Sequence, residues 1–490
     1  MAVSELENLD HIVSLAKARG FVFQSSEIYG GLGATYDYGP LGVELKRNIR
    51  DFWWKSMTRR HSNIVGVDAA IFMHPDVWKA SGHVDGFNDP MIDDKQSNKR
   101  YRADMIIEGE IAKLRGKDKQ DEANELQQKL DTAGSRNGLC EDLHTIIMDH
   151  EIRAPESGAF EWTDVRQFNL MFKTQFGATS SGEDDDGVYL RPETAQGIFV
   201  NFKNVMDTAR QQIPFGIAQV GKAFRNEVVA RQFVFRMREF EQMEMQYFVE
   251  PGTDGEAYDE WLEERFEWHK ELGIRPAKLR HQDHPEDKLA HYAEAAADIQ
   301  YEFPIGWQEV EGIHNRTDFD LSQHAKHSGK KLEFYDQQQQ KRYTPYVIET
   351  SIGLDRAVLM VLCDAYREEE VDGDTRTVLK INPKLAPTKI GIFPLIKKDK
   401  LQDLAHKIEE DLRDDYKVLY DESGSIGKRY RRQDEAGTPF CITVDFDGVE
   451  SEGEDTVTIR YRDDMTQDRV RVSKLRQVIE EKTKSWKPET

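Results

Sequence analysis

Cysteine is scarce in this sequence. Only Cys140, Cys363 and Cys441 occur among the 490 residues, and no two of them have the CxxC spacing. This scarcity makes a disulfide framework or a cysteine-rich zinc site improbable. It is also typical of proteins that fold in a reducing compartment.

Three further features are lacking. The first twenty residues, MAVSELENLDHIVSLAKARG, are acidic where a secretory signal peptide would be basic. No apolar run approaches the length that crosses a membrane. Positive charge is in deficit, since the formal net charge is -23, which should repel a polyanion on average but does not exclude local basic patches. We therefore expect a soluble, cytoplasmic protein with no membrane contact.

The sequence does contain enough apolar residues for a globular protein of several domains. Residues 5–21 read as a helix with Gly20 near its end, and a second helix follows Pro40. Its apolar residues fall at spacings of three and four, and this wide stripe indicates core or a subunit interface. The stripe consists of Leu41, Leu45, Ile49, Phe52 and Trp53.

Two strongly charged helical segments, at 105–132 and 255–274, are expected to lie on the surface with little to bury. The segments 187–202, 215–227 and 238–250 alternate in polarity between turn signals, which favours strands of an antiparallel sheet.

The stretch 367–388 is polar and ends in two prolines, so it is predicted to be a linker. A small α/β domain is expected after it. The predicted organisation is a catalytic domain over 1–383, with charged insertions near 92–155 and 252–300, followed by a second domain over 384–490.

The stretch Phe224 to Glu244, FRNEVVARQFVFRMREFEQME, alternates arginine, carboxylate and aromatic residues. We interpret it as two antiparallel strands joined by a loop near 228–234, so that side chains two apart share a face. Arg225 and Glu227 would share one face of the first strand. On the second strand, one face would carry Arg236, Arg238, Phe240, Gln242 and Glu244. Spacing alone leaves two interpretations open: a ladder of cross-strand salt bridges, or a surface that binds a ligand with both anionic and cationic groups.

Other segments add polar residues of the same kinds. YLRPETAQG places Arg191 and Glu193 at strand spacing beside a helix start. YTPYVIETSIGLDRAVLMVL reads as a strand, a glycine-containing turn and an apolar helix whose first turn holds Arg356. GWQEVEGIHNRTDFDL contributes Glu309 and Arg316, together with Glu311.

Together these segments resemble the class II aminoacyl-tRNA synthetases, and within that class the dimeric glycyl-tRNA synthetase family. YDYGPLGVELKRNIRDFWW is similar to motif 1 of the class, FRNE with RMREFEQME to motif 2, and TSIGLDR to motif 3. RPETAQGIF, NRTDFDL and SIGKRYRRQDEAGTPFCITVDFD resemble this one family rather than the class as a whole. Six similar segments in family order cover most of the chain, excepting the two charged segments.

The resemblance implies an α+β fold, in which an antiparallel-sheet catalytic domain with helical insertions precedes a C-terminal α/β anticodon-binding domain. It implies ATP-dependent activation of glycine to glycyl adenylate and transfer of the glycyl group to the 3' end of tRNA-Gly. It also implies a homodimer formed through motif 1, so that the apolar stripe after Pro40 would serve both the core and the subunit contact.

The resemblance also assigns residues to ATP. Arg225 would bridge the glycine carboxylate and the α-phosphate, and Arg236 would reach the terminal phosphates, where fixed guanidinium groups hold the charge that builds up during attack. Phe240 and Arg356 would stack on opposite faces of adenine, an arrangement that lysine does not reproduce. The catalytic candidates are Arg225 and Arg356. The remaining ATP-binding candidates are Asn226, Glu227, which would accept from the adenine amino group, and Glu309, which is the candidate Mg²⁺ ligand.

Glycine offers no side chain to grip, so selection must come from holding its ammonium group and filling the space of a methyl group. An ammonium group has three donors, and three carboxylates can meet them. The resemblance assigns Glu193, Glu244 and Glu349 to this role, with Ser351 and Arg316 beside them.

One departure from the family bears on metals. Relatives often carry a cysteine-bearing insertion after the segment that reads SGHVDGFNDP here, whereas this sequence continues MIDDKQSNKRYRAD, without cysteine. We therefore predict no zinc.

Alternative functions are a non-catalytic subunit on the same fold, such as the accessory subunit of a mitochondrial DNA polymerase, or a class II synthetase for threonine, proline or serine. Arg225, Glu227 and Arg356 argue against the first, and RPETAQG, Glu244 and IETS against the second. Arg231, Glu239 and Glu241 have no assigned role, and the basic cluster GKRYRR is either a phosphate-contacting patch or a solvated surface.

Overall fold

A computed structural model describes every residue except 1–2, 5, 7, 134–137, 176–186, 228–231, 286–288, 290–291, 372, 450–452 and 490. Arg231 therefore lies outside the described residues. The chain divides into two compact units. The first comprises Met1–Ala69, Thr194–Lys222 and Gln232–Thr490, and the second comprises Ala70–Glu193 and Ala223–Arg231. Across the described residues, none of the helices combines the length and the apolar character that crossing a membrane requires.

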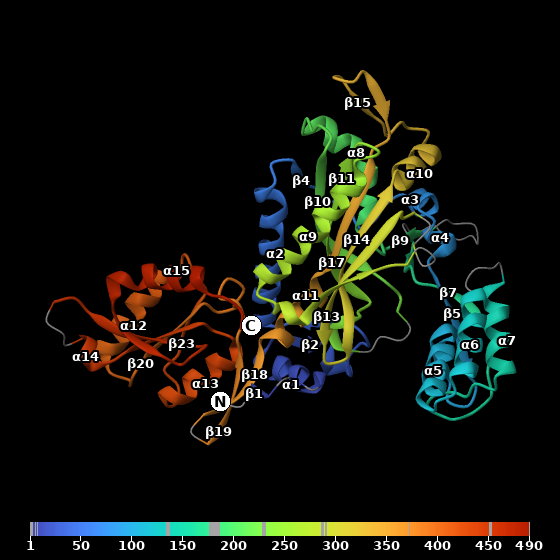
Figure 1. Cartoon of the computed structure of the whole chain (residues 1–490). Helices are drawn as coiled ribbons and strands as arrows, with labels where there is room; N and C mark the ends of the chain where they lie inside the picture. The colour runs from blue at the N-terminus through green and yellow to red at the C-terminus, as the bar shows by residue number, and fades with distance from the viewer. Residues whose placement is uncertain are drawn as a thin grey trace. The chain divides into compact units, whose positions relative to one another are not determined.

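A seven-stranded sheet forms the centre of the first unit, with the order β12-β13-β14-β17-β11-β10-β4 (Figure 1). The pairs β12–β13, β13–β14, β14–β17 and β17–β11 are antiparallel, whereas β10 and β4 are parallel. The predicted antiparallel sheet is thus confirmed. The strands are β4 (Ile64–Gly66), β10 (Phe215–Phe224), β11 (Glu239–Val249), β12 (Leu279–Asp283), β13 (Ala295–Phe303), β14 (Gly306–Thr317) and β17 (Tyr346–Gly353).

Helices of this unit share one hydrophobic core with this sheet, among them α1 (Leu9–Arg19), α2 (Pro40–Arg60), α9 (Asp254–Leu272) and α11 (Leu354–Ala365). The predicted helices are confirmed in α1 (Leu9–Arg19), which ends at Gly20 with φ 74°, and in α2. Leu45, Ile49 and Trp53 of the predicted stripe are completely buried within this chain, so these three residues belong to its core.

The expectation that the second charged segment has little to bury is wrong. α9 packs Trp261, Trp268 and Leu272 into the core, and β12 and β13, which also fall within 252–300, are strands of the central sheet. The charge of this segment is misleading, because Arg265 is buried as well. The guanidinium Nε of Arg265 donates to Glu311 at 2.6 Å. A paired charge does not need solvent.

A second cluster of apolar side chains lies around α8 (Ala195–Thr208) and α10 (Phe319–Ser328). Phe199 and Phe202 of α8 pack there with Phe215 and Phe248 of the sheet. The segment 187–202, predicted as a strand, is strand only at Val188–Tyr189 and is helix from Ala195 onward, because apolar residues spaced three and four apart follow Thr194. This unit also contains two small hairpins: β2 (Val22–Gln24) with β3 (Tyr36–Tyr38), and β15 (Phe334–Asp336) with β16 (Lys341–Tyr343).

The second unit contains the first charged segment, which also has its own core. Ile107, Leu126 and Ile147 are completely buried among the helices α5 (Ala103–Gly116), α6 (Gln120–Ala133) and α7 (Leu139–Asp149) (Figure 1). The expectation of little to bury is wrong here as well, since each charged helix keeps one apolar face. The remaining elements are α3 (Pro75–Ala80), α4 (His83–Gly86), β5 (Asn88–Asp94), β6 (Lys99–Arg102), β7 (Arg166–Asn169), β8 (Lys173–Thr174) and β9 (Val188–Tyr189).

The predicted linker at 367–388 is also wrong over its first half. β18 (Tyr366–Val371) and β19 (Asp374–Leu379) form an antiparallel hairpin, and β1 (Val3–Ser4) adds a third strand, with Val3 opposite Glu369. The charges that suggested solvent exposure are buried and paired: Arg376 donates to Glu369 at 2.6 Å and to Asp434 at 2.8 Å.

The C-terminal part of the first unit is the predicted α/β domain (Figure 1). Its sheet has the order β21-β20-β22-β23-β24 and its own core. The boundary at residue 384 stays a prediction. The elements are β20 (Ile390–Pro394), α12 (Asp399–Leu412), β21 (Val418–Tyr420), α13 (Ile426–Ala436), β22 (Phe440–Val444), α14 (Phe446–Val449), β23 (Thr456–Tyr461), β24 (Gln467–Arg471) and α15 (Leu475–Ser485).

Candidate active site

In motif 2, fewer residues of the Phe224 to Glu244 stretch lie in strands than the alternation of their side chains predicted. Arg225 and Glu227 follow the end of β10, and Arg236 and Arg238 precede β11. A 3-10 turn at Phe233–Phe235 interrupts the extended chain there, because it buries Val234 and Phe235 in the core. Only Phe240, Gln242 and Glu244 of the predicted face share a strand. The predicted placement of Arg225, Glu227, Arg236 and Arg238 on strand faces is wrong.

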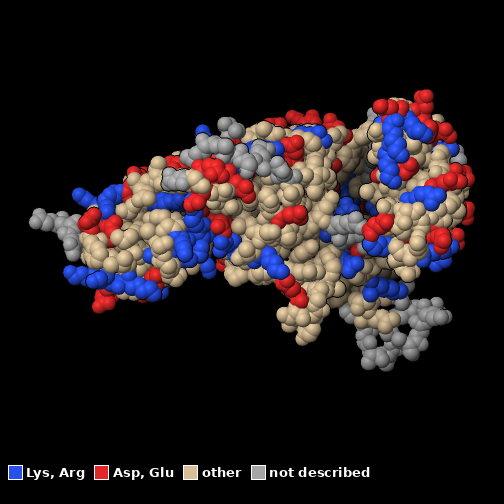
Figure 2. Space-filling view, turned by 90° about the horizontal axis from the view of Figure 1, so that it is seen from below, with Lys and Arg blue, Asp and Glu red and all other residues tan. Residues whose placement is uncertain are grey.

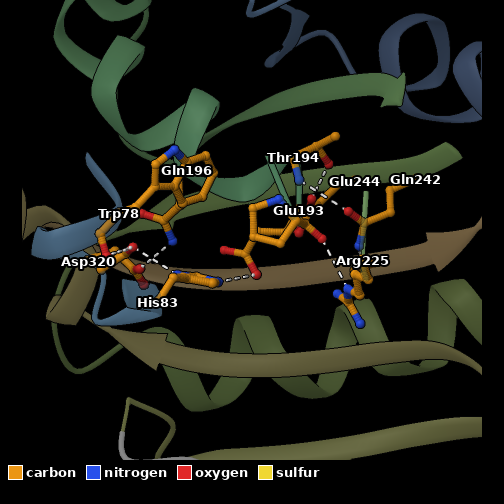
Figure 3. A network of polar contacts seen from close by, with 12 residues as sticks. Trp78, His83, Glu193, Thr194, Gln196, Arg225, Gln242, Glu244 and Asp320 are labelled. Atoms are coloured by element: carbon orange, nitrogen blue, oxygen red, sulfur yellow. Dashed lines mark hydrogen bonds and ion pairs between the residues drawn. The ribbon is translucent and has the colours of Figure 1, made fainter. Parts of the chain in front are cut away.

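Glu244 lies in a buried polar cluster of the first unit. The Thr194 hydroxyl donates to its Oε2, and the Thr194 backbone N–H donates to Gln242 Oε1 at 3.1 Å (Figure 3). Glu244 is directly opposite Ser351 in the pairing of β11 with β17. The structure thus brings together two residues assigned to glycine, Glu244 and Ser351, on adjacent strands.

Glu349 lies two residues before Ser351 and is 4% exposed. Its carboxylate accepts from Gln246 Nε2 at 2.7 Å and from Arg316 Nη1 at 3.1 and 3.2 Å, and His314 Nδ1 lies 3.1 Å from its Oε1. Burial alone would raise the pKa of the Glu349 carboxyl, but the nearby Arg316 guanidinium and these hydrogen bonds hold the pKa well below its usual value. Glu349 therefore stays ionised.

Arg316 connects Glu349 to a second buried carboxylate. Its Nε donates to Asp320 at 2.8 Å, and its guanidinium lies 4.0 Å from the centre of the Tyr292 ring. Asp320 also accepts from Gln196 Nε2 at 3.1 Å (Figure 3). One arginine between two carboxylates leaves this cluster negative, as a site for an ammonium group requires.

Arg356 is in the first turn of α11, as the sequence predicts. Its guanidinium lies 4.5 Å from the centre of the Phe235 ring, and its Nη1 lies 3.4 Å from the Glu309 carboxylate and donates to the Glu309 carbonyl at 3.2 Å. The structure thus pairs two residues that the sequence assigned to ATP, Arg356 and Glu309. Among the described ranges, no cluster of three or more His, Cys, Asp or Glu residues could hold a metal ion.

Asp355, next to Arg356, joins segments that sequence reasoning left apart. Its carboxylate accepts from the Tyr38 hydroxyl at 2.6 Å, from Lys46 Nζ at 2.8 Å and from the Glu241 backbone N–H at 2.8 Å. Lys46 also pairs with the Glu241 carboxylate at 2.6 Å. Glu241, which had no assigned role, is thus a structural residue at the start of β11. The other such residue of this strand, Glu239, forms an ion pair with Lys222.

Four predicted site residues belong to the second unit: Glu193, Arg225, Asn226 and Glu227. Glu193 Oε2 lies 3.3 Å from His83 Nε2 (Figure 3). His83 Nδ1 is 2.8 Å from the Ser81 hydroxyl. Arg225 donates from Nε to the Pro192 carbonyl at 3.1 Å. The guanidinium of Arg225 also lies 5.4 Å from the centre of the Phe87 ring.

Neighbouring motif 2 residues are fixed to the same unit. The Asn226 backbone N–H donates to the Leu170 carbonyl at 2.7 Å, and Glu227 interacts electrostatically with Arg102. Both predicted ATP residues therefore have defined positions within the second unit.

Family models match three parts of the chain: the anticodon binding domain at residues 389–482, the tRNA synthetase class II core domain (G, H, P, S and T) at 172–365, and glycyl-tRNA synthetase insertion domain 1 at 89–125 and 115–170. A glycine–tRNA ligase from Chlorobaculum tepidum is 56% identical over 96% of this chain and 99% of its own length. The chain belongs to the glycine–tRNA ligase family. Family relatives from Treponema denticola and Caldanaerobacter subterraneus are 49% and 50% identical over 98% and 97% of this chain and 98% of their own lengths.

Among solved structures, a prolyl-tRNA synthetase from Cryptosporidium parvum is similar, with a TM-score of 0.60 and 14% identity over 96% of this chain and 75% of that one. This likeness supports the class II fold. For the glycine–tRNA ligase family, the insertion match also shows that the first charged segment, with its own core, is a family domain.

Proposed function

We propose that this chain ligates glycine to tRNA-Gly in two steps. A glycine carboxylate oxygen attacks the α-phosphorus of ATP and releases pyrophosphate. The terminal hydroxyl of the tRNA then attacks the carbonyl carbon of glycyl adenylate and releases AMP. Membership of the glycine–tRNA ligase family supports this reaction, and the observation that carries the substrate assignment is the buried acidic cluster on β11 and β17, which has the charge that an ammonium group needs.

For glycine, we assign to Glu244 and Glu349 the role of stabilising the positive charge of the ammonium group, with Ser351 beside them. Arg316 fixes Glu349, and Glu193 supplies a third carboxylate. Burial of Glu244, Glu349 and Arg316 supports the assignment, because charges in a water-poor site interact more strongly than charges in bulk water.

For ATP, Arg225 and Arg236 are assigned to the phosphates, Asn226 and Glu227 to the nucleotide, and Phe240 with Arg356 to the adenine faces. The Arg356 guanidinium already lies over an aromatic ring, that of Phe235, which supports a role in stacking.

Mg²⁺ would enter with ATP. Glu309 fits such an ion, since Mg²⁺ is commonly held by one or two carboxylates together with substrate phosphates, and its side chain is about half exposed and borders Arg356. The ion would offset phosphate charge, while Arg225 and Arg356 orient the nucleotide.

A homodimer through motif 1 is part of the proposal. Leu45 and Ile49 are buried within the chain, so the subunit contact must use other residues near α2. Ile28 and Tyr29 are 89% and 87% exposed, and Leu32 and Val43 are exposed as well, which supports this surface.

We place tRNA binding on the C-terminal domain. Lys and Arg side chains gather on it in the view of Figure 2. Lys428, Arg431 and Arg432 of α13, with Arg19, line a cavity of about 470 Å³. This basic surface in an acidic chain supports contact with phosphates. A cytoplasmic location fits the same role.

ATP–pyrophosphate exchange tests the proposal with each of the twenty amino acids. Exchange with glycine alone is expected, and exchange with another amino acid, or with none, would contradict it. Arg225→Ala should abolish exchange, because the bridge between the carboxylate and the α-phosphate is lost. Near-normal exchange in that variant would remove the role assigned to Arg225.

A further inference from the structure

Two neighbouring positions on one face of β11 and the two opposite them on β17 form a two-by-two lattice, and residues assigned to glycine occupy three of these four positions. In the pairing of β11 with β17, Glu244 is opposite Ser351, and Gln246 is opposite Glu349. Residues two apart in a strand share a face, and residues directly opposite each other are the closest cross-strand neighbours. Gln246 is therefore the fourth position of the lattice, and it has no role so far.

Gln246 contacts both carboxylates of this lattice. Its Nε2 donates to Glu349 Oε2 at 2.7 Å and lies 3.4 Å from Glu244 Oε1. The side chain is completely buried. Two anions on adjacent strands repel each other, and a donor between them reduces that repulsion while fixing where each oxygen points.

The orientation of the Gln246 amide follows from these contacts. The nitrogen faces the two carboxylates, and Oε1 is buried without a hydrogen-bond partner among the described residues. A buried, unpaired carbonyl is unfavourable for folding. The unpaired Oε1 thus destabilises the fold. The hydrogen bonds that Nε2 donates to the two carboxylates must offset this loss.

We propose that Gln246 is a positioning residue for glycine recognition, which holds Glu244 and Glu349 as a fixed pair of anions without touching the substrate. The proposal rests on the proposed function. Its claim concerns the glycine step alone, since the hydrogen bonds of the Gln246 amide nitrogen go to Glu349 and Glu244, two carboxylates that the proposal assigns to glycine.

The first test is Gln246→Leu, which keeps the approximate volume and removes the donor. In ATP–pyrophosphate exchange, the KM for glycine should rise about tenfold or more, and the KM for ATP should stay within about twofold. The matched control is Gln433→Leu, which removes another buried glutamine, one that accepts from Thr438 in the C-terminal domain. This control should leave both KM values unchanged.

The second test, Gln246→Glu, separates positioning from packing. The new carboxyl would face Glu349 and Glu244, with the cation Arg316 and the titratable His314 on β14 and Asp320 on α10 nearby. Two carboxyls this close share a proton at low pH, and the protonated one donates as the amide does. The KM for glycine should therefore approach the wild-type value near about pH 5.5 and rise steeply by about pH 8.5, relative to wild type at each pH.

The outcomes are distinguishable. A glycine KM within about twofold of wild type in Gln246→Leu, an equal rise in the KM for ATP, or a constant ratio to wild type across pH in Gln246→Glu would each overturn this proposal. Absence of glycine-dependent exchange in the wild-type chain would instead overturn the proposed function.

Discussion

Lys46 and Asp355 form a largely buried ion pair, in which Lys46 keeps partial exposure, with 2.8 Å between Nζ and Oδ1, although 309 residues separate them in the sequence. Lys46 belongs to the motif 1 helix, Asp355 to motif 3, and their common partner Glu241 to motif 2. Three motifs of the class are thus connected through one lysine.

Lys46→Met should destabilise the fold by about 3–5 kcal/mol, because it leaves the buried Asp355 and the neighbouring Glu241 without their cation. Unfolding in urea measures the change. Lys55→Met, at an exposed position of the same helix, should change stability by less than about 0.5 kcal/mol. Equal losses in the two variants would contradict the importance of the pair.

Thr194→Val should raise the KM for glycine about fivefold or more, since the hydroxyl that donates to Glu244 is replaced by a methyl group of similar size. ATP–pyrophosphate exchange at varied glycine gives the value. The matched control is Thr350→Val, because the buried Thr350 hydroxyl has no hydrogen-bond partner among the described residues. If the control changed the KM for glycine as much as Thr194→Val, the contact with Glu244 would not explain the effect.

Arg356→Lys keeps the charge but loses the planar group that stacks on adenine. We expect kcat/KM for ATP to fall about tenfold, and the KM for glycine to change little. Arg342→Lys serves as control, since the Arg342 guanidinium lies 4.7 Å from the centre of the Tyr335 ring in the β15–β16 hairpin. Unchanged ATP kinetics in Arg356→Lys would remove the stacking role.

Glu349→Gln should reduce stability near pH 7 by on the order of 2 kcal/mol, because Arg316 loses the charge of one partner. The Glu349 pKa is depressed in the folded chain, so the ionised carboxylate stabilises the fold above the ordinary value of 4.5 and contributes less as the pH falls below it. The difference between wild type and variant, measured in urea from pH 7 downward, should therefore shrink below about pH 4.5. A difference that grows on acidification would contradict this sign.

Arg376→Met should lower tRNA charging more than it lowers exchange. The buried Arg376 guanidinium of β19 donates to Asp434 of α13 at 2.8 Å and to the Arg462 carbonyl at 2.6 Å, and so fixes the C-terminal domain. Exchange needs only the catalytic residues, whereas charging also needs the tRNA. Comparison of the two activities in one preparation is the measurement, and an equal fall in both would contradict this assignment.

The sequence predicted local elements well where one periodicity dominates. α2 and the strand-turn-helix around Arg356 were predicted from spacing, and the resemblance correctly indicated the family. Charged segments were predicted badly, because a sequence does not show whether a charge is paired. Arg265 and Arg376 are buried, each against a carboxylate far along the chain.

The candidate site was predicted in part. Glu244, Ser351 and Glu349 do lie together on two strands, as assigned. The residues that hold them, Thr194 and Gln246, were missed, because polar uncharged side chains give no distinctive signal. The alternation of Glu244 with Gln246 was the available clue, and it indicates a shared face only once the partner strand is known.

The edge strand β1 has a consequence for the order in which the chain acquires its structure during translation. Val3 pairs with Glu369, so the strand leaves the ribosome about 366 residues before its partner. At about 5–20 residues per second, that interval is roughly 20–70 seconds. Until then β1 must stay unpaired, and closure of the three-stranded sheet is a late event that a ribosome-bound fragment ending before residue 366 cannot reach.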